Sequence, residues 1–186
     1  MPKLHQVNAS KVLFQYVDIP FNDFLFLASN AEKFSLFCTV VKYPDGSVVP
    51  LEKLVDVLPK LKSVELYNNC LSCISTETVK ELLKAPNFKR IDNIRFLGLP
   101  DTFDIDTFFI FIKKNKHVKI SLSFCHEISD AYKNCIGKIF DEIIAEKTHE
   151  YLMPYIDCQR LDYMKNHILR EKYYAVNRLS KNIDFV

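Results

Sequence analysis

The stretch LKSVELYNNCL, Leu61 to Leu71, decides how this chain folds. Its apolar residues include Val64 and Leu66, and the polar Asn69 stands three places after Leu66. Successive residues of a strand point to opposite sides, so Val64 and Leu66 are expected to point into a core while their neighbours face outward. The side-chain amide of Asn69 can satisfy backbone groups where the chain turns away from the strand.

Strands of the same kind recur along the chain at nearly constant spacing. Leu36, Leu66 and Phe96 follow one another at 30-residue intervals, and Leu122 comes 26 residues later. These intervals lie at the upper edge of the leucine-rich-repeat length of about 20–29 residues, and the opening stretch fits that repeat's signature L-x-x-L-x-L-x-x-N-x-L with Val64 in place of one leucine. We predict an α/β fold, a short leucine-rich-repeat-like solenoid of four or five repeats, with parallel strands on one face and helices on the other.

Helical patterns alternate with the predicted strands. Pro50 suits a first helical position, Ser75 or Thr76 can cap a helix, and Asp104 or Asp106 favours a helix N-terminus. We predict strands at 11–17, 33–41, 62–66, 93–97 and 117–124, helices at 50–58, 75–86, 104–115 and 129–149, an extended segment at 151–159 and a last helix at 160–174.

The last third of the chain differs from the rest, because a longer amphipathic helix begins near Ser129. A terminal helix commonly covers the open core of a last repeat. We predict α/β repeats over 1–128, a C-terminal helical cap of the same domain over 129–175, and a tail over 176–186. A doubly wound α/β sheet would give the same alternation, but no strand-to-helix turn carries the Gly-rich phosphate fingerprint of nucleotide-binding domains.

Composition and charge exclude several classes of function. The 186 residues include 25 basic and 23 acidic side chains in mixed order, with a net charge of +2, so we expect no nucleic-acid partner. No apolar run approaches the ~18 residues of a membrane span, and the start lacks the apolar core of a signal peptide. We therefore expect no membrane association and a cytoplasmic or nuclear location.

One long segment adds a family resemblance. The residues DTFDIDTFFIFIKKNKHVKISLSFCHEISDAYKNCIGKIFDEIIAEKTHEY, Asp101 to Tyr151, resemble the C-terminal repeat region of nematode F-box proteins, particularly the expanded sets of plant-parasitic nematodes, and the likeness extends over roughly residues 50–160. The resemblance implies a target-recognition subunit of a ubiquitin ligase, with a ligase adaptor as a further partner. It also allows a nematode effector, secreted into a host cell after removal of a signal peptide. The chain departs from the family pattern because no L-P-x-E F-box helix stands near its start; the nearest fragment is DIPFNDF from Asp18.

The cysteines and histidines provide the alternative function. Cys70 and Cys73 have the C-x-x-C spacing of a thiol redox pair or a metal site. Zinc would need two further ligands, and none follows at a suitable distance. Cys125 and His126 are neighbours on a strand, so they point to opposite faces and form no catalytic dyad. We expect reduced thiols, no catalytic residue, no metal and no cofactor, so that the chain is not an enzyme.

The outward-facing residues of the predicted strands form the candidate site. Aromatic and arginine side chains are enriched at binding hot spots, and stacking the strands would bring such residues together. We therefore predict a non-enzymatic protein–protein interaction module that binds an unidentified protein partner, while partly covered sheet residues that need no partner are the competing interpretation. The predicted protein-binding residues are Phe37, Glu65, Tyr67, Arg95, Leu97 and Lys119.

Overall fold

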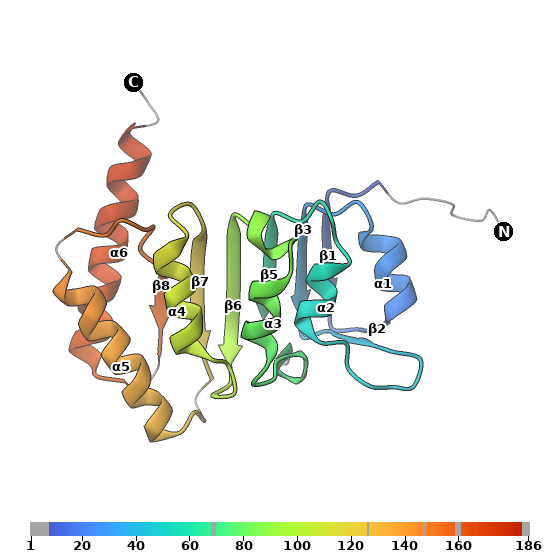
Figure 1. Ribbon diagram of the computed structural model, residues 1–186, viewed down its shortest axis with the longest axis horizontal. Helices are drawn as coiled ribbons and strands as arrows, with labels where there is room; N and C mark the ends of the chain where they lie inside the picture. Colours follow the sequence, from blue (N-terminus) through green and yellow to red (C-terminus); the bar gives the residue numbers. More distant parts are fainter. Residues whose placement is uncertain (1–7, 68–69, 126, 147, 159–160, 184–186) are drawn as a thin grey trace.

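The computed structural model describes residues 8–67, 70–125, 127–146, 148–158 and 161–183. A six-stranded sheet lies at its centre (Figure 1). Each strand pairs in parallel with the next strand of this sheet along the chain, so the prediction of an α/β fold with a parallel sheet is confirmed. The strands are β1 (Lys11–Gln15), β3 (Lys33–Phe37), β5 (Ser63–Tyr67), β6 (Asn93–Leu99), β7 (Lys119–Phe124) and β8 (Tyr155–Asp157), in this order across the sheet.

The register of the sheet follows the spacing found in the sequence. Leu36 pairs with Leu66, Leu66 with Phe96, and Phe96 with Leu122. These four side chains are no more than 2% exposed and form one row of the core. A buried strand residue therefore recurs at each predicted position. β6 and β7 change register between Leu97 and Leu99, around a glycine with φ of 87°.

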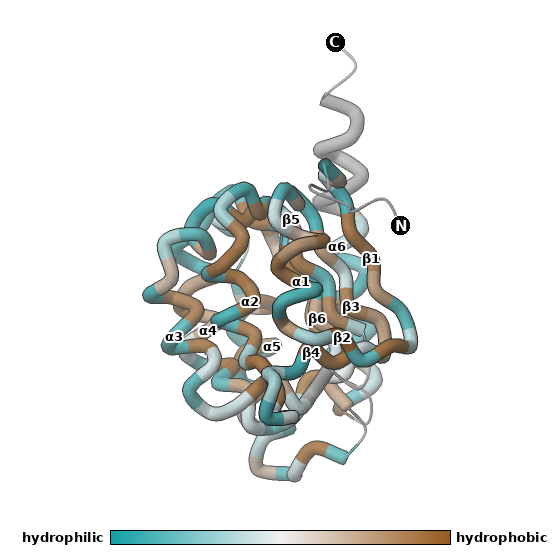
Figure 2. Tube along the Cα trace, turned by 90° about the vertical axis from the view of Figure 1, so that its right-hand side faces the viewer, coloured by the Kyte–Doolittle hydropathy of each residue, from teal (hydrophilic) through white to brown (hydrophobic). Residues whose placement is uncertain are grey.

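Four helices cover one face of the sheet (Figures 1 and 2). The helices are α1 (Phe21–Ala28), α2 (Leu51–Asp56), α3 (Thr78–Lys84) and α4 (Ile105–Lys114), and the short 3₁₀ turns are η1 (Cys70–Cys73) and η2 (Phe88–Arg90). In α2, α3 and α4 the apolar residues recur at helical spacing, which gives each of these helices a buried stripe. In the longest of them, the Asp104 carboxylate accepts a hydrogen bond of 3.0 Å from the Thr107 N–H, as predicted for its N-terminus.

The C-terminal part of the chain continues both layers. Helix α5 (Asp130–Ala145) begins after Ser129, whose hydroxyl accepts a hydrogen bond from the Tyr132 N–H, and it packs against α4. The segment expected to be extended forms β8, and α6 (Tyr163–Ile183) packs against α5 and β8 at the end of the sheet (Figure 1). Helix α6 continues to Ile183. The predicted boundaries, at 128 between repeats and cap and at 175 before the tail, stay predictions.

The predicted strand over 33–41 is wrong in its second half. Cys38 has a φ of 46°, so the chain bends there and does not continue β3. The following residues form β4 (Val40–Lys42), which pairs in parallel with β2 (Asp18–Pro20) as a separate two-stranded sheet. Cys38 is half-buried at the bend. Thr39 is 1% exposed, and its hydroxyl donates a hydrogen bond to the Phe37 carbonyl at 3.1 Å.

Helix α1 is an element that the sequence analysis did not predict. Its apolar residues are nearly continuous, so no helical period stands out in FNDFLFLA. Phe24 is fully buried, and its ring lies 6.0 Å from the Phe14 ring and 5.8 Å from the Phe34 ring, centre to centre. The nearest F-box-like fragment, from Asp18, therefore forms β2 and the first turn of a core helix.

Candidate functional site

The sheet has one side turned away from helices α1 to α4, and we call this side the open face. Its residues alternate along each strand with the buried residues of the core, and the parallel register arranges them in three rows across the sheet. All six predicted binding residues lie on this face. From the amino to the carboxyl ends of the strands, the rows are Lys11, Lys33, Ser63, Asn93 and Lys119; then Leu13, Ser35, Glu65, Arg95, Ser121 and Tyr155; then Gln15, Phe37, Tyr67, Leu97, Ser123 and Asp157.

Aromatic side chains form a continuous line near the carboxyl ends of the strands. The rings of Tyr16 and Phe37 are 5.2 Å apart and meet edge to face, and those of Phe37 and Tyr67 are 5.6 Å apart. The Arg95 guanidinium lies over the Tyr67 ring at 5.6 Å, a cation–π distance. We call this series of side chains, Tyr16–Phe37–Tyr67–Arg95, the aromatic line. It offers apolar area and one cation on rigid backbone.

Glu65 lies beneath this surface instead of on it. Its side chain is only 12% exposed and accepts hydrogen bonds from Lys33 Nζ at 2.7 Å, from Ser35 Oγ at 3.0 Å and from Tyr67 Oη at 3.1 Å. Burial alone would raise the pKa of Glu65, but these donors outweigh it and lower the pKa below its ordinary value. Glu65 is therefore largely covered within the open face, and its role in binding a partner stays a prediction. The carboxylate positions Tyr67.

The three other predicted residues differ in exposure. Arg95 and Lys119 are exposed, and Leu97 is half-buried next to Tyr67 in the register. Within the described ranges, neither Arg95 nor Lys119 forms an ion pair with a carboxylate. Two cations on the open face are thus accessible to a partner.

The sequence analysis missed two residues at the first strand. Leu13 is 57% exposed and Tyr16 is 73% exposed. Together with Lys11, Phe37 and other neighbours, Leu13 lines a shallow groove of about 410 Å³ that extends over β1, β3 and β5. The repeat spacing could not identify these two residues. β1 pairs with β3 at an offset of 22 residues, whereas the outward positions of β3, β5 and β6 were predicted from a spacing of 30 residues.

The C-x-x-C pair lies in the turn η1. The side chain of Cys70 lies outside the described residues, as do Asn69 and His126, so what was predicted for these three residues stays a prediction. Cys73 is 7% exposed, which gives a solvent thiol or metal ion little access to its sulfur. In the part of the chain that the structure describes, no three His, Cys, Asp or Glu side chains converge on a common point as metal ligands would.

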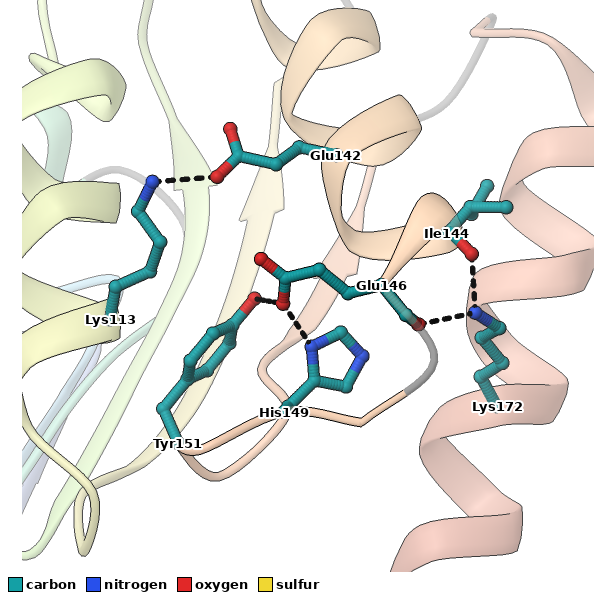
Figure 3. A network of polar contacts seen from close by, with 7 residues as sticks. All are labelled: Lys113, Glu142, Ile144, Glu146, His149, Tyr151 and Lys172. Carbon is teal, nitrogen blue, oxygen red and sulfur yellow. Dashed lines mark hydrogen bonds and ion pairs between the residues drawn. The ribbon is translucent and has the colours of Figure 1, made fainter.

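A second polar cluster joins the C-terminal helices (Figure 3). The Glu146 carboxylate lies 2.6 Å from His149 Nδ1 and accepts a hydrogen bond from Tyr151 Oη at 3.1 Å. Burial and the nearby Glu146 raise the pKa of Tyr151, so its hydroxyl stays protonated and continues to donate. Lys172 of α6 donates to the carbonyl of Ile144 at 2.6 Å and to that of Glu146 at 3.3 Å. The cluster closes the C-terminal end of α5 and holds it to α6.

No family model, no curated protein and no solved structure matches the chain at a significant level. Within the ranges that the structure describes, none of the helices combines the length and the apolar character needed to cross a bilayer.

Proposed function

We propose that this chain is a non-enzymatic protein-interaction module, built as a short leucine-rich-repeat-like solenoid that binds a protein partner on its open face. The strand order supports the solenoid, because each strand of the main sheet is added next to its predecessor in the chain. The repeated 30-residue register and the single helical layer of α1 to α4 agree with it. A doubly wound sheet would instead reverse its strand order and carry helices on both faces.

The observation that carries the binding function is the aromatic line. Phe37 and Tyr67 are partly exposed although they lie on a rigid sheet, and Arg95 is stacked on Tyr67. Rigid aromatic anchors with an adjacent arginine lose little conformational entropy when they bind, which is why such residues dominate protein interfaces. The helical side is a poorer anchor, because exposed pairs such as Lys80–Glu77 are solvated charges.

The resemblance to nematode F-box proteins makes this proposal more specific. In that reading the open face selects the protein to be ubiquitinated, in a ligase subunit or in an effector derived from one. The thiol alternative at Cys70 and Cys73 has less support, since the Cys73 side chain is buried.

The proposal is tested by affinity capture with the immobilised chain, followed by mass spectrometry and titration of the captured partner. We expect Tyr67→Ala and Arg95→Ala each to weaken binding by ~1–3 kcal/mol, the usual range for interface anchors. The control is Lys80→Ala, which lies on the helical side and should leave the affinity unchanged. Loss of binding in the control, with Tyr67→Ala and Arg95→Ala silent, would place the site on the helices.

A further inference from the structure

The open face carries an uneven distribution of charge. Its three rows contain four cations and two carboxylates, so this one face carries a net charge of +2, as much as the whole chain. Glu65 is already bound to Lys33 beneath the surface, so that pair contributes little charge to a partner. The charged residues of the face are Lys11, Lys33, Arg95 and Lys119, against Glu65 and Asp157.

The two exposed cations at the centre are close together. Arg95 pairs with Ser121 and Lys119 pairs with Asn93, so Arg95 and Lys119 are diagonal neighbours on β6 and β7. Diagonal neighbours of adjacent strands lie about 7–8 Å apart, within reach of one acidic segment. The residues between them, Asn93 and Ser121, are polar and uncharged. The Arg95 guanidinium rests against the Tyr67 ring, so its planar fork is held in place for a carboxylate.

An apolar strip lies beside these cations. Phe37, Tyr67 and Leu97 belong to the same row, two residues further along their strands than the row of Arg95. Two residues of a strand span about 6–7 Å. A partner that fits both features therefore needs carboxylates and aromatic or aliphatic side chains within one turn of a helix, or at nearby positions of an extended segment.

We propose that the open face binds an acidic amphipathic segment of a protein, with its carboxylates on Arg95 and Lys119 and its apolar side chains on Phe37, Tyr67 and Leu97. This inference rests on the proposed function and names the chemistry of the partner. A nucleic acid fits less well, because the rings of the aromatic line meet edge to face or tilted and present no series of flat faces for stacked bases.

The test uses the purified full chain and a phage-displayed library of short random peptides. An enriched peptide is synthesised with a fluorescent label, and its affinity is measured by anisotropy at low and high salt. The variants are Arg95→Glu, Lys119→Glu and Tyr67→Ala, with Lys80→Glu on the helical side as the matched charge reversal. Single-stranded oligothymidylate is titrated as the competing probe. Chemical-shift changes in the wild-type chain locate the bound peptide if a variant does not fold.

We expect the enriched peptides to contain Asp or Glu next to aromatic or aliphatic residues, and to shift resonances of β5, β6 and β7. Each charge reversal at Arg95 or Lys119 should weaken binding by about tenfold or more, high salt should weaken it further, and Lys80→Glu should have no effect.

Two groups of outcomes contradict the inference, and they differ in what else they overturn. Neutral or basic peptides that lose affinity with Tyr67→Ala but not with the charge reversals overturn the acidic chemistry and leave the proposed function standing. Three other outcomes overturn both the acidic chemistry and the proposed function. They are competition by oligothymidylate at Arg95, peptides whose affinity no open-face variant changes, and a library that yields no enriched peptide.

Discussion

Removal of the Glu65 carboxylate is the sharpest test of how the open face is built. In Glu65→Ala, the Ser35 hydroxyl, in a residue only 4% exposed, loses its acceptor, which costs about 1–3 kcal/mol. Lys33 is 36% exposed and regains water, so its ion pair contributes at most about 1 kcal/mol. The bond from Tyr67 adds about 0.5–1 kcal/mol. We expect the free energy of unfolding to fall by about 3 kcal/mol.

The assay is urea unfolding followed by far-ultraviolet circular dichroism. The matched control is Glu32→Ala, which breaks the exposed Lys62–Glu32 pair and should cost less than about 1 kcal/mol. If the two variants lose the same stability, Glu65 does not organise the face in the way that its contacts indicate.

The same carboxylate gives the protein a dependence on pH. Because the pKa of Glu65 is lower in the folded chain than in the unfolded chain, its contribution is complete above the unfolded value of about 4.3. The contribution is lost as the pH falls through the lower folded value. The stability difference between wild type and Glu65→Gln should therefore shrink in acid, and an unchanged difference would contradict this assignment.

Three further predictions concern the core and the C-terminal helices. Phe96→Ala empties a fully buried site and should lower the free energy of unfolding by about 3–5 kcal/mol in urea titrations; a loss below about 1 kcal/mol would mean that the core refills the space. Lys172→Ala removes the donor that closes α5, so backbone amides at 141–146 should exchange faster in hydrogen–deuterium exchange, and unchanged rates would show that the helix end is held otherwise. Burial and a hydrogen bond to Asp106 raise the pKa of the Cys135 thiol to about 11; Asp106→Asn should therefore speed alkylation of Cys135 at mildly alkaline pH, measured by peptide mass spectrometry, and an equal or slower rate would contradict this role.

The sequence predicted the parallel sheet because buried positions repeat in it. Val64 and Leu66 alternate with polar or aromatic neighbours, and the 30-residue interval carries this alternation to β3 and β6. Since register in a parallel sheet follows from which side is buried, the sequence alone predicts that Phe37, Tyr67 and Arg95 share one face.

The remaining features depend on contacts between strands that no single stretch encodes. Cys38 adopts a positive φ, a conformation that is most common for glycine and asparagine. A cysteine at this position therefore gave no reason to predict the bend. Glu65 is buried because Lys33 and Ser35 of the neighbouring strand donate hydrogen bonds to it. From the sequence alone, a glutamate at an outward position is expected to be exposed. Helix α1 was not predicted because its nearly continuous apolar sequence shows no helical period. Its Phe24 is buried by a contact with Phe34, which belongs to a different strand.

The order of strands in the main sheet has a consequence for how the chain reaches its folded state. Residues that pair across it lie only 22 to 34 positions apart, from Lys11↔Lys33 to Ser121↔Tyr155, and among the described strands β1 and β8 do not pair with each other. Closing a loop of that length costs little more entropy for one pair than for another. Folding can therefore begin at any neighbouring pair and spread in both directions, and a chain shortened after β7 would retain every pairing from β1 to β7.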